Sequence, residues 1–518
     1  MTFTAPNASG EPTVGRRAAV LAICCTAVVM ANLDTTAVNV ALPAIRRDLG
    51  ASVAGAQWVA AGYTLVLACL LTFSGALADR IGRRTVFQLG TVIFAVGSLA
   101  CGLAPSLGWL ITFRIAQAVG GSMLNPVAMA IITAVFTEPR ARVRAIGVWG
   151  ASIGVSMAAG PVVGGLLVDA VGWGAVFLIN VPIAAVAVVA TSFLVPQSKS
   201  ELPRVLDPIG QLLLTGTLGL LVFAIIEGPH RGWRSAVTVG CLLGAAACLT
   251  VLLRYEPRHR DPLIDPRAFR SVLFSGAFVI AALAYAALGG FLFLNTFYLQ
   301  EIRGDTALRA GLSLLPMAAA MFVFGPLSGR LVAERGARIA LTAGASAATG
   351  AAVLLGFTFD TSVRAALLAG YAVFGAGIGL INTPITATAV AGLPIEQAGV
   401  AASLATTSRQ LGQTIGVAVI GSIIGGHPDA LRSAADFHAP AAASWHTIAV
   451  LTVAALIVTR IATGPAARRT LSLPVGPRGP RPNVPPPVSR PMHFAPALAV
   501  RVTDPGVRSD VGVLVAAR

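Results

Sequence analysis

The sequence predicts an all-α membrane protein built from about fourteen transmembrane helices. Of its 518 residues, 56% are hydrophobic and only 11% are charged, whereas a typical soluble domain has about 25% charged residues. Apolar stretches of roughly 20 residues, the length that spans a bilayer, recur along nearly the whole chain. Because lipid offers no partner to a bare backbone group, each stretch must form a helix.

The first apolar stretch follows the polar segment 1–17. It is longer than the core of a signal peptide and leads directly into a second stretch, so we expect a retained helix and not a cleaved signal. The predicted helices cover residues 18–42, 53–77, 86–104, 108–135, 145–168, 174–195, 208–227, 235–254, 272–299, 309–331, 338–357, 363–391, 400–424 and 444–463.

The distribution of arginine predicts how the chain is oriented. The net charge is +16, and basic residues can indicate nucleic-acid binding. Here they gather in short loops: with the N-terminus inside, the inner loops carry roughly twice as many basic residues as the outer ones, as the positive-inside rule requires. Arg46 and Arg47 are exceptions. We therefore expect both termini in the cytoplasm, a chain in the cytoplasmic membrane and no nucleic-acid partner.

Residues beyond the helices predict no further folded domain. The stretch 464–518 is rich in proline and arginine and lacks a sustained apolar run, so we expect a disordered basic tail. The six cysteines fall inside apolar stretches without metal-ligand spacing, and the six histidines are scattered. No phosphate-binding Gly-rich motif is present. We expect neither an enzyme, nor a metal, nor a cofactor.

One carboxylate and one arginine stand out within the predicted membrane segments. Asp34 lies in the first helix, and a carboxylate costs about 2.5–3.5 kcal/mol to place there, which makes it a functional candidate. In the fourth helix, Arg114, Gln117, Gly121 and Asn125 share one face. Asp34 lies roughly 12 Å and Arg114 roughly 9 Å from the outer ends of their predicted helices, so the two can lie at the same depth. The sequence therefore predicts a pair that couples proton movement or, alternatively, a static ion pair that fixes helix packing.

Two glycine-rich stretches complete the candidate motifs. The loop 75–84 reads Gly-Ala-Leu-Ala-Asp-Arg-Ile-Gly-Arg-Arg, in which glycines permit a tight reversal and arginines anchor the inner side; a weaker echo lies at 329–338. In the fifth helix, small residues allow close helix approach and a Gly-Pro step bends the helix. The members singled out are Gly75, Asp79, Arg80, Gly82 and Arg83 in the loop, and Gly147, Gly154, Gly160, Pro161, Gly164 and Gly165 in the fifth helix.

These motifs resemble those of the major facilitator superfamily. The loop 75–84 is similar to its signature loop, and segment 33–43 is similar to the first-helix motif of its fourteen-helix drug:proton antiporters. Further similar segments are 173–182, 298–316 and 409–416. Ser156 and Gly174 depart from the usual residues. The resemblance covers about residues 18–463 and implies a six-helix bundle over 18–195, two linker helices over 208–254 and a second bundle over 272–463.

The resemblance also implies roles for the motifs. The loop residues would gate conformational change, or serve only as a topology anchor. Arg114 would take part in proton coupling with Asp34. The fifth-helix motif is found in exporters, although ordinary close packing would use the same residues. The implied function is export of small organic compounds in exchange for protons, with the proton gradient as the driving force; a nutrient symporter on the same fold is the alternative.

Polar and aromatic side chains inside the helices are candidates for lining a central cavity. Each alone is more often a hydrogen-bonding group between helices. Together they predict a mostly apolar pocket with few polar fixtures, which suits small lipophilic substrates. We expect the partners to be such a substrate, protons and membrane lipid, and the chain to act as a monomer. The cavity candidates are Gln57, Tyr63, Gln117, Asn125, Asn295, Asn382 and Arg409.

Overall fold

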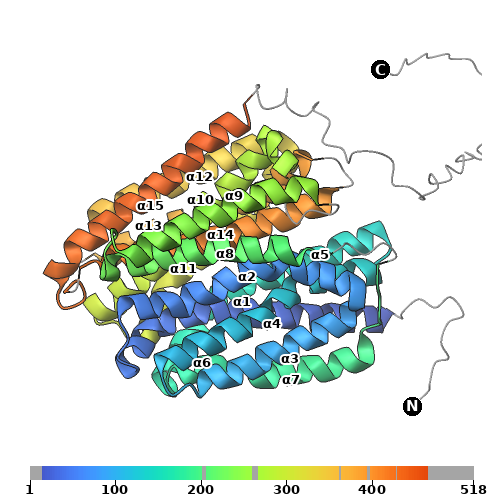
Figure 1. Ribbon diagram of the computed structural model, residues 1–518, viewed down its shortest axis with the longest axis horizontal. Coiled ribbons are helices and arrows are strands. Elements are labelled where there is room, and N and C mark those ends of the chain that lie inside the picture. Colours follow the sequence, from blue (N-terminus) through green and yellow to red (C-terminus); the bar gives the residue numbers. More distant parts are fainter. Residues whose placement is uncertain are drawn as a thin grey trace, which may run out of the picture. The chain divides into compact units, whose positions relative to one another are not determined.

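The computed structural model describes residues 14–200, 206–259, 266–360, 363–393, 397–427 and 429–464. Within these ranges the chain is helical and contains no strand (Figure 1). The expected disordered tail falls almost wholly outside the described residues.

The long helices follow the predicted order, and they include one that is interrupted. Gly174–Leu178 and Asn180–Leu194 form two helices that together make one span, and a π-helical turn at Tyr298–Ile302 extends the tenth helix. The bounds are α1 Val14–Asp48, α2 Val53–Ile81, α3 Arg83–Gly102, α4 Leu107–Val135, α5 Pro139–Ala170, α6 Gly174–Leu178, α7 Asn180–Leu194, α8 Pro208–Arg231, α9 Ala236–Tyr255, α10 Val272–Phe297, α11 Ala307–Arg335, α12 Ala337–Thr358, α13 Arg364–Ala391, α14 Ala398–Gly425 and α15 Ala434–Ala462.

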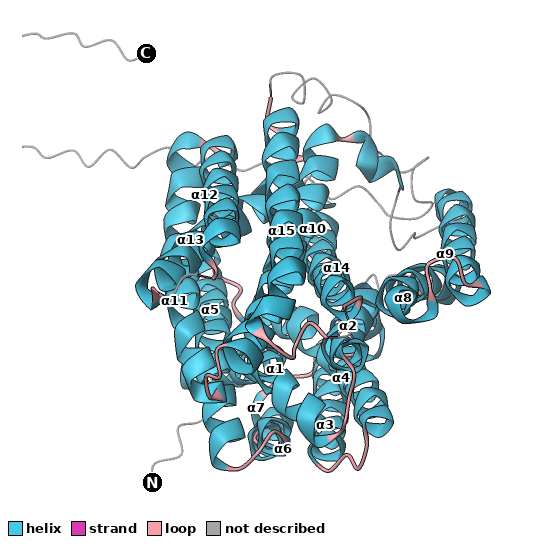
Figure 2. Cartoon of the chain, turned by 90° about the vertical axis from the view of Figure 1, so that its left-hand side faces the viewer, coloured by secondary structure: helices cyan, strands magenta, loops and turns pink. Residues whose placement is uncertain are grey.

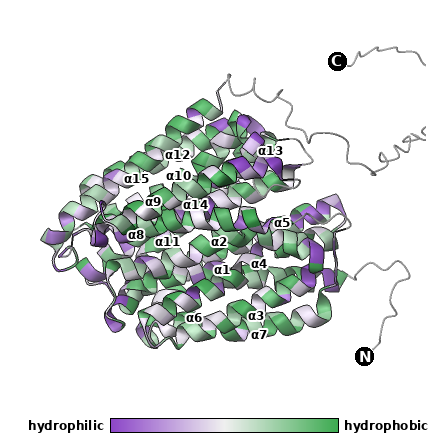
Figure 3. Ribbon diagram, viewed as in Figure 1, coloured by the Kyte–Doolittle hydropathy of each residue, from purple (hydrophilic) through white to green (hydrophobic). Residues whose placement is uncertain are grey.

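The predicted membrane architecture is confirmed. Among the described residues, 13 spans are long and apolar enough to cross a bilayer, and α14, with 28 residues, is the remaining long helix. Hydrophilic residues gather at the two ends of the helices, and hydrophobic residues cover the length between them (Figure 3). An apolar band of this kind matches a bilayer, whose hydrocarbon core is about 30 Å thick.

Several helix ends differ from the predicted ones, and the differences in α1 and α15 have a clear physical cause. We expected the first helix to end at residue 42, before Pro43, but α1 continues through that buried proline to Asp48. In a membrane protein, neighbouring helices can replace the backbone bond that proline removes. We expected the last helix to begin at residue 444, but α15 begins at Ala434, where the Ser433 hydroxyl accepts a hydrogen bond from the Asp436 amide at 3.2 Å and caps the helix.

The helices form two bundles and a peripheral pair. Helices α1–α7 make the N-terminal half and α10–α15 the C-terminal half. Helices α8 and α9 pack on each other and stand to one side of both halves (Figure 2). Helix α8 contacts α2 in one half and α14 in the other, so the linker pair lies along the seam between the halves.

The two sides of the bundle differ in how the halves meet. We call the side where α1 begins and α15 ends the termini side, at the right in Figure 1, and the opposite side, where α1 ends, the far side. Towards the far side α5 packs directly on α11: a Cβ on Gly165 would lie 2.4 Å from the Ala307 carbonyl oxygen. Towards the termini side a Cβ on Gly150 or Gly325 would meet nothing within 4 Å. The halves are therefore closed together at the far side and apart at the termini side.

Candidate functional site

The centre of the N-terminal half holds a fully buried carboxylate. Asp34 of α1 is 0% exposed and Arg114 of α4 is 1% exposed, and an Arg114 guanidinium nitrogen lies 2.6 Å from Asp34 Oδ2. Asp34 Oδ1 accepts hydrogen bonds from the Gln117 and Asn180 side-chain amides, each at 3.0 Å. Three donors from α4 and α7 thus surround one carboxylate from α1, and charge-assisted bonds of this kind are about twice as strong as neutral ones.

The guanidinium of Arg114 is fixed on every side. It donates to the Val59 carbonyl at 3.3 Å and to Gln117 Oε1 at 2.7 Å. Its central carbon lies 4.0 Å from the ring centroid of Tyr63 and 5.5 Å from that of Phe177, which adds cation–π attraction. A planar guanidinium held in this way can turn only if its hydrogen bond to Asp34 or to Gln117 breaks.

Asn180 and Ser98 belong to this network, although neither was among the predicted site residues. The Ser98 hydroxyl accepts hydrogen bonds from Gln117 at 2.6 Å and from Asn180 at 3.3 Å. Both side chains are 0% exposed. The available signal was Asn180 itself, an amide in an apolar segment at the first position of α7, the longer part of the sixth span. Ser98 offered no signal, because serine is common in membrane helices.

The predicted depth of Asp34 was wrong, although the two side chains are in contact. Because α1 continues six residues beyond 42, Asp34 lies 14 residues before the end of its helix, or about 21 Å. Arg114 lies only 7 residues after the start of α4. The C-terminal end of α1 and the N-terminal end of α4 therefore do not lie at the same depth. The contact between the two side chains follows from the packing of α1 on α4.

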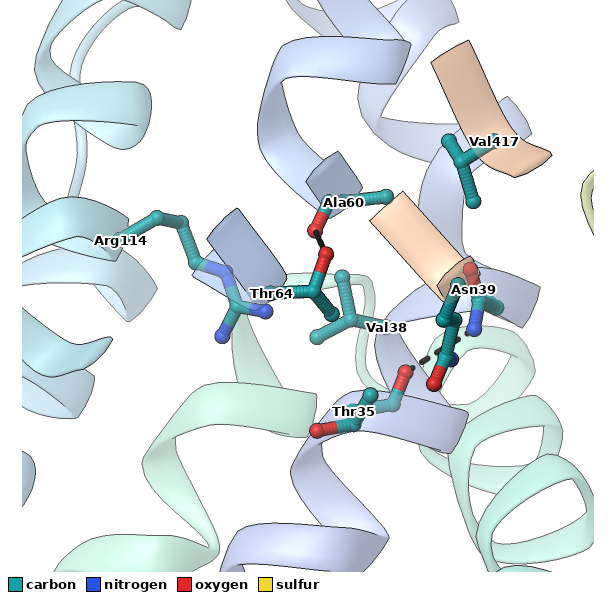
Figure 4. Close-up of a pocket in the computed structure, with 8 residues that line it drawn as sticks. Thr35, Val38, Asn39, Ala60, Thr64, Arg114 and Val417 are labelled. Atoms are coloured by element: carbon teal, nitrogen blue, oxygen red, sulfur yellow. Dashed lines mark hydrogen bonds between the residues drawn. The ribbon is translucent and has the colours of Figure 1, made fainter. Parts of the chain in front are cut away.

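A small pocket connects Arg114 with the seam between the halves (Figure 4). The space in it that a water-sized molecule can occupy is only about 10 Å³, roughly enough for one water and far below the roughly 300–1,000 Å³ of sites for drug-sized ligands. Hydroxyl and amide groups from both halves face it, including Thr64 of α2 and Gln413 of α14. The full lining is Thr35, Val38, Asn39, Ala60, Thr64, Arg114, Gln413 and Val417.

The predicted gating loop covers the end of α2, Gly82 and the start of α3, and it contacts its own half. Gly82 has φ +114°, a conformation that L side chains rarely adopt, so glycine is required at this reversal. Asp79 Oδ1 accepts a hydrogen bond from Arg83 at 3.2 Å, and the Arg83 guanidinium also reaches the Ala130 carbonyl at 3.3 Å. The segment after α7 lies against this loop, since the Arg83 amide donates to the Ser198 carbonyl at 2.9 Å.

Two members of the loop motif flank this contact. Arg80 lies in the last turn of α2. A Cβ on Gly75 would lie 4.0 Å from Pro126 of α4, which is ordinary packing.

The glycines of α5 divide into a packed and an open group. Gly160, Pro161, Gly164 and Gly165 are buried, and a Cβ on Gly164 would lie 2.7 Å from Ala37 Cα. A Cβ on Gly154 would lie 3.1 Å from the Phe322 ring of α11, and one on Gly147 would meet nothing. The far-side part of the motif therefore seals α5 against α1 and α11, Gly154 lies at the edge of this contact, and Gly147 faces open space.

Four predicted cavity residues are enclosed in this conformation. Gln57 donates to the Val417 and Ala418 carbonyls of α14 at 3.3 and 2.7 Å, and it closes the α2–α14 contact. Tyr63 and Gln117 belong to the surroundings of Arg114 and Asp34. Asn295 is 1% exposed and accepts a hydrogen bond from the Tyr371 hydroxyl within the C-terminal half.

The other three cavity candidates are less enclosed. Asn382 of α13 is exposed and accepts a hydrogen bond from the Tyr285 hydroxyl at 2.9 Å. Arg409 of α14 is half-buried. Asn125 of α4 is half-buried, and its Oδ1 atom is buried without a hydrogen-bond partner in the described part of the chain.

Polar contacts at the far side tie the halves and the linker together. Arg46, one of the exceptions to the arginine bias, pairs with Glu301 of the other half at 3.2 Å. The Asp169 carboxylate at the end of α5 accepts hydrogen bonds from the Ala307 and Leu308 amides at 3.1 and 2.9 Å, so it caps α11 from the opposite half.

Glu227 lies in the last turns of the linker helix α8. Its side chain is 20% exposed and accepts hydrogen bonds from Trp58 Nε1 and Arg231 Nε, each at 3.1 Å. Since Trp58 belongs to α2, Glu227 fastens the linker helix α8 to the N-terminal half.

Comparison with known proteins identifies the relatives of this chain. The family model described as Major Facilitator Superfamily matches residues 24–417. "Multidrug resistance protein Stp" of Mycobacterium tuberculosis is 38% identical over 395 residues, covering 76% of this chain and 73% of that protein. "Tetracenomycin C resistance and export protein" of Streptomyces glaucescens is 37% identical over 402 residues, covering 77% of this chain and 74% of that protein.

Solved structures share the fold at low sequence identity. A crystal structure of a POT family transporter in complex with a thioalcohol conjugated peptide matches with a TM-score of 0.64 and 14% identity, over 88% of this chain and 96% of that chain. At this identity the likeness concerns the fold alone.

Proposed function

Because the chain belongs to the major facilitator superfamily, we propose that it is a proton-coupled antiporter that exports small organic compounds by alternating access. The relatives named above are resistance and export proteins, which supports export over nutrient uptake. The observation that carries the proposal is the buried Asp34–Arg114 pair at 2.6 Å. An ionisable pair inside a membrane bundle is a candidate proton site by default.

The geometry suggests how a proton would act on the pair. A proton on Asp34 removes the negative charge that holds Arg114, and the guanidinium then keeps its bonds to Val59, Gln117 and the Tyr63 ring. Gln117 and Asn180 each keep Ser98 as a second acceptor. The network therefore retains polar partners in both protonation states, as a site that is repeatedly loaded and emptied requires.

The closed far side and open termini side support alternating access. In the proposed cycle, the α5–α11 and α2–α14 contacts separate when the far side opens, and the gating loop 75–84 meets the opposite half when the termini side closes. The pocket beside Arg114 reaches Gln413 and Val417 of α14. A change at Asp34 is thus next to a seam that must open.

The arginine bias supports the proposed orientation and domain division. We place both termini in the cytoplasm and the chain in the cytoplasmic membrane, so the termini side faces the cytoplasm. The bundles cover 18–195 and 272–463, with linker helices at 208–254. The proton gradient drives transport without a cofactor, and a monomer contains both halves of the transport path.

The test uses inverted membrane vesicles that contain the full chain. With an acidic lumen, we expect uptake of at least one compound from a panel of cationic, neutral and anionic fluorescent aromatic compounds, and collapse of that uptake by nigericin. Asp34→Asn should reduce gradient-driven uptake to the level of vesicles without the chain, at equal protein content. Asp429→Asn is the matched control, because Asp429 pairs with Arg432 at an exposed site. Unchanged gradient-driven uptake in Asp34→Asn would contradict the proposed coupling site.

A further inference from the structure

Arg409 is a positive charge that lies deep along helix α14. It lies 11 residues after the start of α14 and 16 before its end, or about 17 and 24 Å along the helix axis. It forms no ion pair with any residue that the structure describes. The other deeply placed charge, Asp34, is balanced by Arg114.

The known contacts of Arg409 are all with neutral groups. Its two terminal nitrogens donate to the hydroxyls of Thr386 and Thr406 at 3.2 and 3.1 Å. The guanidinium carbon lies 5.9 Å from the Tyr285 ring centroid. A guanidinium has five N–H donors, so these contacts orient the group and leave donor capacity for a further acceptor.

Arg409 lies beside an exposed part of α13. Asn382 is exposed although it lies in the interior of α13, and it accepts a hydrogen bond from Tyr285 of α10. Arg409 contacts Tyr285 and Thr386, one turn from Asn382 on α13, and it is itself half-buried. A partly exposed guanidinium next to an exposed polar residue is accessible to a solute that reaches this part of α13.

From these observations we propose that Arg409 binds the anionic group of the exported compound. The substrate class is a small organic anion, such as a carboxylate or phenolate on an apolar aromatic body. Arginine offers paired N–H donors that match a carboxylate, and the Tyr285 ring offers an aromatic surface for the apolar body. This inference rests on the proposed transport function and adds the charge of the substrate to it.

An uncompensated arginine is costly to place at such depth, and an incoming anion would offset that cost. The Asp34–Arg114 pair carries no net charge, so it does not compensate the charge of Arg409. Gln413, one helical turn from Arg409 on α14, lines the pocket that reaches Arg114. The pocket beside Arg114 therefore ends one helical turn from the proposed anion site.

Binding to the purified full chain in detergent tests the inference without any gradient. The probes are 9-anthracenecarboxylate, its primary amide of equal shape, and the cation tetraphenylphosphonium, each measured by equilibrium dialysis. We expect the acid to bind at least about tenfold more tightly than the amide, the size of one charge-assisted hydrogen bond. The same preference over tetraphenylphosphonium is expected. Equal binding of acid and amide, stronger binding of the cation, or no binding of the acid would overturn the proposal.

Substitution then tests the residue. Arg409→Gln keeps hydrogen-bonding capacity and should reduce the acid-to-amide ratio to near one, whereas Arg409→Lys keeps the charge and should retain part of it. An undiminished ratio in Arg409→Gln would overturn the assignment to this residue. If that variant does not fold, the ranking of the three probes by the unmodified chain still decides the substrate charge. A chain that prefers the acid but shows no gradient-driven uptake would refute the antiport and not this inference.

Discussion

At the scale of single residues, replacing one member of the buried Asp34–Arg114 pair should affect stability differently from replacing both. Asp34 and Arg114 are 0% and 1% exposed, so bulk water does not solvate either charge in this conformation. Breaking a buried pair by removing one member costs about 3–5 kcal/mol, because the remaining charge is uncompensated. A structural pair and a coupling pair would both suffer from the single change, so a second variant is needed to separate them.

The double variant Asp34→Asn with Arg114→Gln provides that separation. Two amides of similar size can hydrogen-bond to each other and to Gln117, so we expect protein yield and thermal stability to recover relative to Arg114→Ala. Gradient-driven uptake should remain absent, because no carboxylate is left to take a proton. Yield, unfolding temperature in detergent and vesicle uptake are the measurements. Recovery of gradient-driven uptake would show that the pair serves packing alone.

The residues of this site differ in how far the sequence alone predicts them. Asp34 and Arg114 could be found because a charge in an apolar helix is expensive and therefore conspicuous. Asn180 and Ser98 could not be assigned to the network, because their contacts cross from α7 and α3 to α1 and depend on how helices pack. Gln57 was predicted to line a cavity, but it bonds to backbone carbonyls of α14. In the sequence, a polar residue within an apolar helix looks the same whether it lines a cavity or bonds to a neighbouring helix.

At the scale of elements, the contact between α5 and α11 depends on the absence of side chains. A Cβ on Gly311 would lie 2.1 Å from the Pro161 carbonyl oxygen, so the two backbones touch. The sequence predicted close packing around the α5 glycines, and it could not identify α11 as the partner. The extent of the seal, which ends near Gly154 and Phe322, also depends on the conformation and not on the motif.

We expect Gly311→Ala to push α11 away from α5. Overpacking of this kind costs typically 1–3 kcal/mol, so the unfolding temperature should fall and the initial rate of uptake should drop about tenfold or more. Gly325→Ala on the same helix is the matched control, since its Cβ would meet nothing within 4 Å, and we expect it to be near neutral. Equal effects of the two substitutions would contradict the assignment of the seal to Gly311.

At the scale of the whole molecule, the two halves are held at the far side by contacts that must break during transport. They include the Arg46–Glu301 ion pair, the Asp169 cap on α11 and the bonds of Gln57 to α14. The family resemblance gave two bundles and two linker helices from the sequence. It could not give this closed state, because the same contacts exist in only one of the conformations that alternating access requires.

A disulfide across the seam tests whether this state belongs to the transport cycle. Thr64 of α2 and Thr414 of α14 lie with their hydroxyl oxygens 2.8 Å apart, so Thr64→Cys with Thr414→Cys should place two sulfurs within bonding reach in a chain whose six native cysteines are replaced. We expect oxidation to abolish uptake and a reductant to restore it, because the bond prevents α2 and α14 from separating. The single-cysteine variants should be insensitive to oxidant. The cross-link is verified by mass spectrometry. Full uptake by the oxidised double variant would mean that the α2–α14 contact stays closed throughout the cycle. The far side would then have to open between other helices.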